Sequence, residues 1–267
     1  MGMRGSIAIG VLVAVACTIG SAGAAVEPLA FLRGSTLAGP VHLRLIVAGT
    51  PPYVFDLDRA TVVPFDAARD TTDIVDLVPY GHGALATIDP RRGPTSSLVL
   101  TASGSRRAAS ALETRAARRA SLRWAVARDG ERHLMLVDRS SWQRRRLPWK
   151  SILGYLDGAY EQPHGPYVAI GFADPAYPGP QQAEDVFLLN RSSGAFTHVP
   201  GFPAQLDLKR SSMAWTDDGR LVFLVGDARG TRIGTYRPGA RTVALRRVAL
   251  PAASGGSDQF VPVAAPG

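Results

Sequence analysis

The residues best suited to do chemistry in this sequence are arginines gathered in one part of the chain. Residues 101–150 hold 13 Arg and Lys against 4 Asp and Glu, although the whole 267-residue chain has a formal net charge of only +8. Guanidinium groups bind phosphate and carboxylate oxygens through paired N–H donors. We therefore expect two arginine clusters to form a candidate anion-binding patch: Arg106, Arg107, Arg115, Arg118, Arg119, Arg144, Arg145 and Arg146.

Two simpler explanations compete with that patch. The clusters can be a solvated charged loop, and the arginines can reflect the codon bias of a GC-rich genome, because only Lys150 and Lys209 among the 30 basic residues are lysine. If the arginines do bind, anionic lipid headgroups or cell-envelope polymers fit them. Nucleic acid is not expected, since no aromatic stacking pattern accompanies the arginines.

No motif of catalysis, metal binding or cofactor binding accompanies the arginines. None of the five histidines has another three to five residues away, so zinc-ligand spacing is missing. Neither a Gly-x-Ser-x-Gly elbow nor a phosphate-binding glycine loop occurs. We therefore assign no catalytic, cofactor-binding or metal-binding residue. Neighbouring carboxylates are interpreted as turn residues: Asp56/Asp58, Asp73/Asp76 and Asp217/Asp218.

The first 25 residues are typical of an export signal. Arg4 precedes an uncharged run whose core, from Ile7 to Ile19, suits a signal peptide and is short for a bilayer span. Residues 1–25 are therefore expected to be a signal peptide or an N-terminal membrane anchor. The chain would then be secreted or anchored outside the cytoplasmic membrane. The single cysteine, Cys17, lies inside this run in a poor lipidation context, which disfavours a lipoprotein.

The rest of the chain consists of predicted short strands joined by tight turns. These elements must position the arginines. The stretch MAWTDDGRLVFLVGDARGTRIGTYRPGARTVAL alone contains four such strands, separated by Asp-Gly and Pro-Gly turns. Three similar turns follow apolar strands at Asp58-Arg59, Asp138-Arg139 and Asn190-Arg191, where an Asp or Asn can bond the backbone two residues on. The spacing indicates about five units, at 36–66, 71–105, 121–150, 152–200 and 211–250.

These units predict one all-β domain over residues 26–263, a β-propeller-like ring of about five blades with three to four antiparallel strands each. The Arg/Ala-rich segment 105–121 has high helix propensity. We expect it to be a helical or irregular insertion that replaces blade strands and leaves the ring irregular or incomplete. The apolar segments 26–35 and 257–263 should pair with the blade at the opposite end of the chain, because a ring must cover its outer sheet edges.

Several segments also resemble blades of a known group. SMAWTDDGRLVFLV, YVAIGFADP, DVFLLNRSSG and YVFDLDRATV are similar to blades of TolB-type and WD-repeat-like β-propellers, in particular exported propellers of high-GC bacteria with no assigned function. In such blades the third and fourth strands join at Asp-x-x-Gly. Gly194 fits that pattern, whereas the Asp58 and Asp138 turns have no glycine.

Fold resemblance says little about function, because propellers host binding, scaffolding and hydrolysis alike. We favour a non-enzymatic binding or scaffold protein at the bacterial cell envelope, with an unknown protein or envelope polymer as partner and no cofactor. Two alternatives stay open. One is a hydrolase or lyase with its site at the central channel, and the other is a truncated remnant of a larger propeller.

Overall fold

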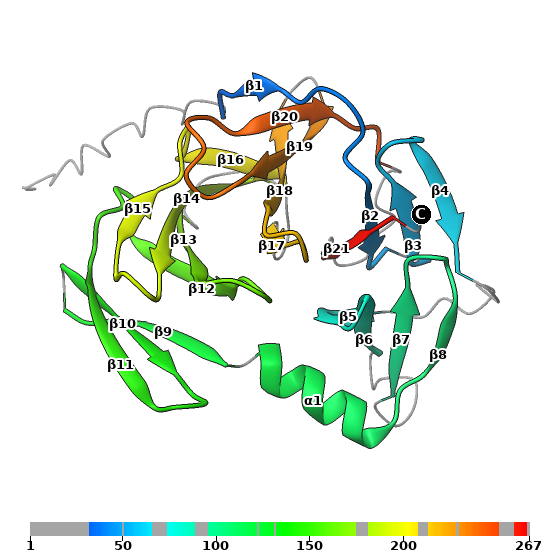
Figure 1. The fold of residues 1–267 in the computed structure, drawn as a ribbon, viewed down its shortest axis with the longest axis horizontal. Helices are drawn as coiled ribbons and strands as arrows, with labels where there is room; N and C mark the ends of the chain where they lie inside the picture. Colours follow the sequence, from blue (N-terminus) through cyan, green and yellow to red (C-terminus); the bar gives the residue numbers. More distant parts are fainter. Residues whose placement is uncertain are drawn as a thin grey trace, which may run out of the picture.

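Short aliphatic and aromatic runs form strands wherever Gly, Pro, Asp or Asn residues separate them. The computed structural model describes residues 32–49, 51–65, 74–88, 96–121, 123–130, 132–174, 181–207, 213–227, 230–250 and 259–265. The strands in these ranges form five sheets arranged around a common centre, which is the β-propeller-like arrangement expected from the repeats (Figure 1). Neighbouring strands are antiparallel apart from one pair, β1 and β20.

The blades are numbered along the chain, and their strands are given from the centre outwards. Blade 1 contains β21 (Phe260–Ala264), β2 (Leu43–Val47), β3 (Tyr53–Asp56) and β4 (Thr61–Pro64). Blade 2 contains β5 (Ile74–Tyr80), β6 (Gly83–Ile88), β7 (Ser97–Thr101) and β8 (Arg106–Ala108). Blade 3 contains β9 (Trp124–Arg128), β10 (His133–Asp138) and β11 (Gln143–Pro148). Blade 4 contains β12 (Tyr155–Glu161), β13 (Tyr167–Asp174), β14 (Gln181–Asn190) and β15 (Phe196–His198), with β16 (Ala204–Asp207) also paired to β14. Blade 5 contains β17 (Met213–Trp215), β18 (Leu221–Asp227), β19 (Gly230–Tyr236), β20 (Ala244–Arg247) and β1 (Ser35–Thr36).

Both ends of the described chain pair with a blade from the other end, as the need to cover sheet edges predicts. The C-terminal strand β21 is antiparallel to β2, with Phe260 opposite Val47, and so provides the inner strand of blade 1. At the other end β1 lies parallel to β20, and Leu32 before it is buried in the apolar cluster between blades 4 and 5. Residues 1–31, and with them the expected export segment 1–25, lie outside the described residues. Within the described ranges, no helix has the length and apolar character needed to cross a bilayer.

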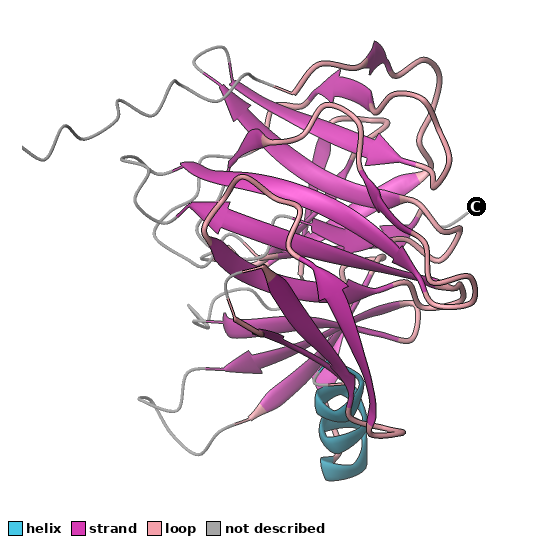
Figure 2. Cartoon of the chain, turned by 90° about the vertical axis from the view of Figure 1, so that its left-hand side faces the viewer, coloured by secondary structure: helices cyan, strands magenta, loops and turns pink. Residues whose placement is uncertain are grey.

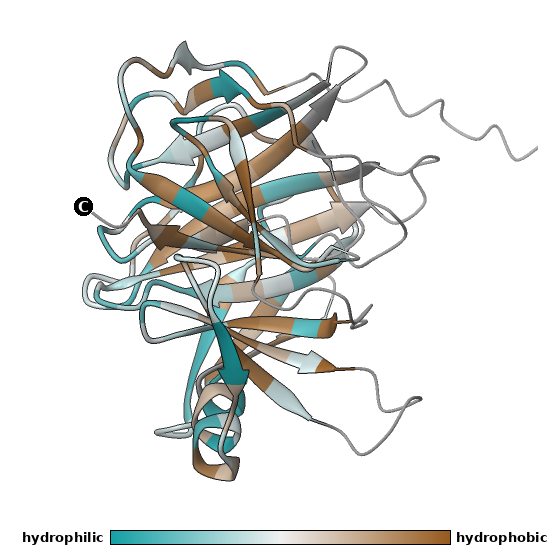
Figure 3. Cartoon of the chain, turned by 90° about the vertical axis from the view of Figure 1, so that its right-hand side faces the viewer, coloured by the Kyte–Doolittle hydropathy of each residue, from teal (hydrophilic) through white to brown (hydrophobic). Residues whose placement is uncertain are grey.

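Buried apolar side chains fill four of the five seams between adjacent blades. Separate clusters lie between blades 1 and 2, 3 and 4, 4 and 5, and 5 and 1. Apolar residues accordingly run along the strands inside the molecule (Figure 3). Within the described residues no such cluster lies between blades 2 and 3, where the helix α1 (Ala111–Ser121) crosses the seam instead. In the side view α1 lies at the lower edge of the molecule, below the sheets (Figure 2).

The turns that end the third strand of a blade are closed by a carboxylate or amide oxygen. Asp138 Oδ1 accepts the Ser140 amide at 2.9 Å, and Asn190 Oδ1 accepts the Ser192 amide at 2.9 Å. These contacts confirm the predicted turns at both residues.

The prediction for Asp58 was wrong, because Asp56 closes that turn. Asp56 Oδ1 accepts the amides of Asp58 at 3.1 Å and Arg59 at 3.0 Å. The Asp58 carboxylate instead accepts the amides of Val41 and His42, at 2.6 and 2.7 Å, and so fixes the segment that leads into β2.

The position of Asp138 shows which strand blade 3 lacks. Asp56 ends β3 and Asn190 ends β14, and each of these is the third strand of its blade. Asp138 ends β10, so β10 and β11 correspond to third and fourth strands and β9 to a second strand. Blade 3 therefore has no inner strand, and α1 occupies the corresponding part of the chain, between β8 and β9 (Figure 1).

Within the expected insertion at 105–121, α1 stands in place of the inner strand of blade 3, but the outer strand of blade 2 is present. Residues 106–108 form β8, which pairs with β7 from Leu98 to Leu100. The Ala-rich part of the segment is helical, as its propensity predicts.

The segment 174–185, which its Pro and Gly content marks as a loop, contains the start of β14, because residues 181–184 pair with β16.

Candidate anion-binding site

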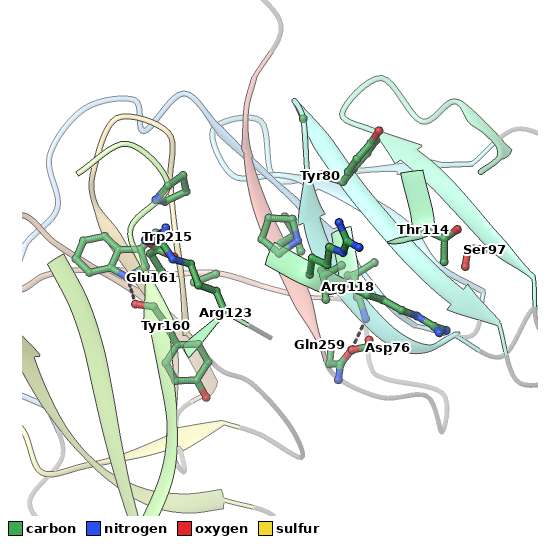
Figure 4. Close-up of a pocket in the computed structure, with 18 of the residues that line it drawn as sticks. Asp76, Tyr80, Ser97, Thr114, Arg118, Arg123, Tyr160, Glu161, Trp215 and Gln259 are labelled. Carbon is green, nitrogen blue, oxygen red and sulfur yellow. Dashed lines mark hydrogen bonds and ion pairs between the residues drawn. The ribbon is translucent and has the colours of Figure 1, made fainter. Parts of the chain in front are cut away.

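A cavity of about 1730 Å³ lies at the centre of the ring. Its walls come from the inner strands β5, β12, β17 and β21, from α1, and from the start of β9. Figure 4 shows two groups of lining residues facing each other across this space, with Arg123, Tyr160 and Glu161 on one side and Tyr80 and Arg118 on the other. The absent inner strand of blade 3 is the structural reason for α1 forming part of the wall.

A capping box fixes the start of α1. The Glu113 amide bonds to Ser110 Oγ at 3.2 Å, and the Ser110 amide donates to Glu113 Oε2 at 2.8 Å. Arg107 in β8 donates to both oxygens of Glu113, at 3.0 and 2.6 Å. The Arg107 guanidinium and the Ser110 amide together hold the pKa of Glu113 well below its usual range. Tyr80 of β5 adds a longer bond to Glu113, at 3.4 Å, which ties the helix to blade 2.

The arginines of α1 form the basic wall of the cavity. Arg115, Arg118 and Arg119 all line it, because residues separated by three and four positions share one helix face. Arg139, from the turn after β10, lines it as well. Within the described residues Arg115, Arg119 and Arg139 form no ion pair, and all three side chains are exposed.

The acidic residues of the cavity do not neutralise this wall. Asp76, Glu161 and Asp217 line the same space. Glu161 is already bound by Arg123 at 2.9 Å and by Arg191 at 2.6 Å. The carboxylates of Asp76 and Asp217 are thus left to balance Arg115, Arg119 and Arg139, so the cavity wall carries more positive than negative charge.

A second crevice, of about 750 Å³, opens between blades 3 and 4. Arg144 and Arg145 of β11 line it, together with Arg191 from the turn after β14. The crevice and the central cavity share Arg123, Trp124 and His164 in their walls, so the two spaces adjoin at these residues.

An ordered network of ion pairs holds the junction between the two spaces. Arg123 donates to both oxygens of Asp138, at 3.2 and 3.0 Å, and its remaining terminal nitrogen reaches Glu161. The Arg123 guanidinium lowers the pKa of Asp138 well below its usual range, and its hydrogen bond to Asp138 raises the pKa of Arg123 itself. Arg191 completes the chain through Glu161. The network links blade 3 to blade 4 and fixes the direction of Arg123.

Trp124 lies between the two arginines of that network. The guanidinium carbons of Arg123 and Arg191 lie 5.4 and 5.6 Å from its ring centroid, which is within cation–π range. Its indole Nε1 is buried and has no hydrogen-bond partner among the described residues. A buried N–H without an acceptor costs free energy, which the packing of the ring against the two arginines must offset.

The structure brings five of the eight predicted arginines to these two spaces. Arg115, Arg118 and Arg119 line the cavity, and Arg144 and Arg145 line the crevice. The other three predicted residues lie outside both: Arg106 and Arg107 in β8 and Arg146 in β11. Two of these three are engaged in ion pairs on the surface, Arg107 with Glu113 and Arg146 with Asp129.

Sequence reasoning missed three further arginines that line these spaces: Arg123, Arg139 and Arg191. A signal for two of them was present, because Arg139 and Arg191 each follow the Asp or Asn that closes a turn. The repeated Asp/Asn-Arg pair identifies the turn but does not show which space its arginine faces.

Among the described residues no group of three or more His, Cys, Asp or Glu is placed to hold a metal ion. Asp185 accepts hydrogen bonds from Ser151 at 2.7 Å and from His198 at 2.6 Å. The carboxylate therefore lies between the hydroxyl and the imidazole, whereas an activated serine requires the histidine in the middle.

Comparison with known proteins gives no family for this chain. No family model matches it, and no curated protein matches it. Among solved structures it is similar to TolB from Acinetobacter baumannii, with 10% identity, a TM-score of 0.34, and coverage of 76% of this chain and 52% of that one. It is also similar to the tricorn protease, with 12% identity, a TM-score of 0.29, and coverage of 88% and 25%. The chain thus spans about half of the first protein and a quarter of the second, and its fold assignment rests on its own strand order and pairing.

Proposed function

We propose that this chain is an exported, non-enzymatic binding protein of the bacterial cell envelope, and that its central cavity takes an anionic ligand. The observation that carries the proposal is the replacement of an inner blade strand by α1, which places three arginines in the wall of the cavity.

Electrostatics on the helix supports the same role. Arg115 and Arg119 are like charges at i and i+4, and such pairs destabilise a helix by roughly 0.2–0.5 kcal/mol. A bound anion would offset the repulsion between the two guanidinium groups, because it attracts both of them. It can accept hydrogen bonds from the forked N–H donors of both residues. The carboxylate of Glu161 is already committed to Arg123 and Arg191, which supports binding over acid–base catalysis.

Binding is tested by titrating the folded chain with tripolyphosphate, using calorimetry and tryptophan fluorescence, since Trp124 lines the cavity. The variant Arg115→Gln with Arg119→Gln should bind about 30-fold more weakly, because each exposed arginine near an anion contributes about 1 kcal/mol. Arg241→Gln, an exposed arginine of blade 5 outside both spaces, is the control of equal chemistry. Raising the salt from 0.1 M to 1 M should abolish binding, as the screening length falls from ~10 Å to ~3 Å.

Equal affinities of the double variant and the parent, or binding that ignores salt, would contradict the proposal. Export is tested separately by producing the full chain in a bacterium, fractionating the cells and measuring the mass of the product. Recovery outside the cytoplasm, either cleaved near residue 25 or intact in the membrane fraction, is expected. An uncleaved cytoplasmic product would contradict the export part alone.

A further inference from the structure

The two arginine-lined spaces adjoin, and their basic residues follow one another from the centre of the ring to its outer edge. Arg115 and Arg119 lie in the central cavity, Arg123 at the junction, and Arg144 and Arg145 in the crevice. We propose that cavity and crevice form one continuous groove that binds a linear polymer with phosphate groups in its backbone. The inference deepens the proposed function, because it names the class of ligand for the same site.

The arrangement of charge argues for an extended ligand. A small anion in the central cavity contacts the arginines of α1 but not those of β11, because these residues line different spaces that meet only at Arg123, Trp124 and His164. Arg145 directs its guanidinium toward blade 4, where it donates to the Arg191 carbonyl at 3.3 Å. It therefore stands beside the junction, on the side away from α1. Only a chain that passes the junction engages both groups.

The directions of the arginines argue for charge in the ligand backbone. Figure 4 shows Arg123 and Arg118 on opposite sides of the cavity, so a ligand between them meets cations on two sides. A phosphate chain carries oxygens all around its backbone and can accept from both. An extended peptide presents successive carboxylates on alternating faces and also brings amides that need partners of their own.

The junction between the two spaces is rigid. Trp124 lines both spaces, and the guanidinium groups of Arg123 and Arg191 lie within cation–π range of its indole ring. Asp138 and Glu161 pair with these two arginines, so the junction is a fixed passage between the arginines of α1 and those of β11.

The test compares long-chain polyphosphate with tripolyphosphate on the full chain and on two variants of one strand. Arg145→Gln removes a charge from the crevice, and Arg146→Gln removes the same charge from the neighbouring residue, which lies outside both spaces and pairs with Asp129. We expect Arg145→Gln to weaken binding of the long chain about fivefold, which corresponds to about 1 kcal/mol. It should leave tripolyphosphate binding unchanged, and Arg146→Gln should change neither.

The outcomes separate this inference from the proposed function. If neither phosphate compound binds, the proposed function itself fails. If tripolyphosphate binds and Arg145→Gln does not weaken the long chain, the cavity binds anions but the continuous groove is wrong. Poly-glutamate of equal charge that binds as tightly as polyphosphate would overturn the preference for phosphate. Tighter binding of single-stranded DNA would show that bases are read and would overturn a polymer defined by its backbone alone.

Discussion

The turn after the third strand has the same backbone geometry in blades 1, 3 and 4. This geometry predicts opposite effects on stability for a substitution in blade 1 and one in blade 4. In blades 1, 3 and 4, the fourth residue after the Asp or Asn that ends the third strand has a positive φ. These residues are Ala60 at 53°, Trp142 at 58° and Gly194 at 78°. Of the three, only Gly194 adopts this region without strain, because it has no Cβ to crowd the following carbonyl oxygen. Replacing Ala60 by glycine should therefore stabilise the protein, and replacing Gly194 by alanine should destabilise it.

Two opposing terms set the size of both effects. A left-handed conformation costs an L-residue roughly 1–2 kcal/mol, and glycine loses about 0.5–1 kcal/mol more backbone freedom on folding. Packing adds little, since Ala60 is exposed and a Cβ on Gly194 would meet only Arg145 Nη1, at 3.7 Å. The net change in the free energy of unfolding is about 0.5–1 kcal/mol in each direction. For a domain of this size that corresponds to about 1–4 °C in melting temperature.

The assay is urea unfolding followed by circular dichroism, with thermal melts as a second measurement. Ala60→Gly should raise the midpoint, Gly194→Ala should lower it, and the double variant should return to the parent value, since the turns belong to different blades. Unchanged m-values would show that the variants unfold from the same compact state. A lower midpoint for Ala60→Gly, or a higher one for Gly194→Ala, would refute the equivalence of the turns.

Three further predictions concern the closing strand, the junction and the helix. Deleting residues 259–267 removes three side chains of β21 that are 2–6% exposed. Each is worth roughly 1.5–3 kcal/mol, so the melting temperature should fall by about 10 °C or more, and an unchanged melt would contradict ring closure. Asp138→Asn should cost about 1–3 kcal/mol in urea unfolding, because Arg123 loses a forked partner. The pKa of Asp138 is lower in the folded state than in the unfolded state. Its contribution to the free energy of unfolding is therefore complete above about pH 4 and is lost as the pH falls further. The parent should accordingly lose stability below pH 4 more steeply than the variant. Glu113→Ala removes the side-chain half of the capping box of α1 and should speed hydrogen exchange in 111–121 while the strands exchange as before. Equal exchange would show that the Glu113 carboxylate is dispensable to the helix.

The strands and their grouping could be predicted because their signals are local. Apolar runs between turn residues specify strands wherever they occur, and five predicted units correspond to the five observed blades. The assignment of Asp58 failed because Asp56 and Asp58 stand two residues apart at the end of one strand, and both residue types suit an Asx turn. The choice between them depends on the residue at which the strand ends. Arg44 of β2 fixes that end by binding Asp56 at 3.0 Å. That contact is non-local.

The candidate site could be predicted only in its composition. The arginine clusters are visible in the sequence, and so is the helical character of 111–121. The central cavity could not be predicted, because its walls come from all five blades and from residues as far apart in the sequence as Asp76 and Gln259. Arg191 joins Arg123 through Glu161, and the three residues are spread over blades 3 and 4. Such neighbours follow from ring geometry and not from spacing along the chain.

The helix that makes the cavity basic also makes one seam of the ring different from the others. Four seams are filled with buried apolar side chains, whereas α1 packs on β5 and is held at its start by polar contacts to Glu113. Binding sites are often drawn from the least stable part of a fold. An anion held between Arg119 of α1 and Arg139 of blade 3 would connect the two blades across that seam. Such a ligand would stabilise the folded state by RT ln(1 + [L]/Kd), and the gain would come from the seam that lacks an apolar core.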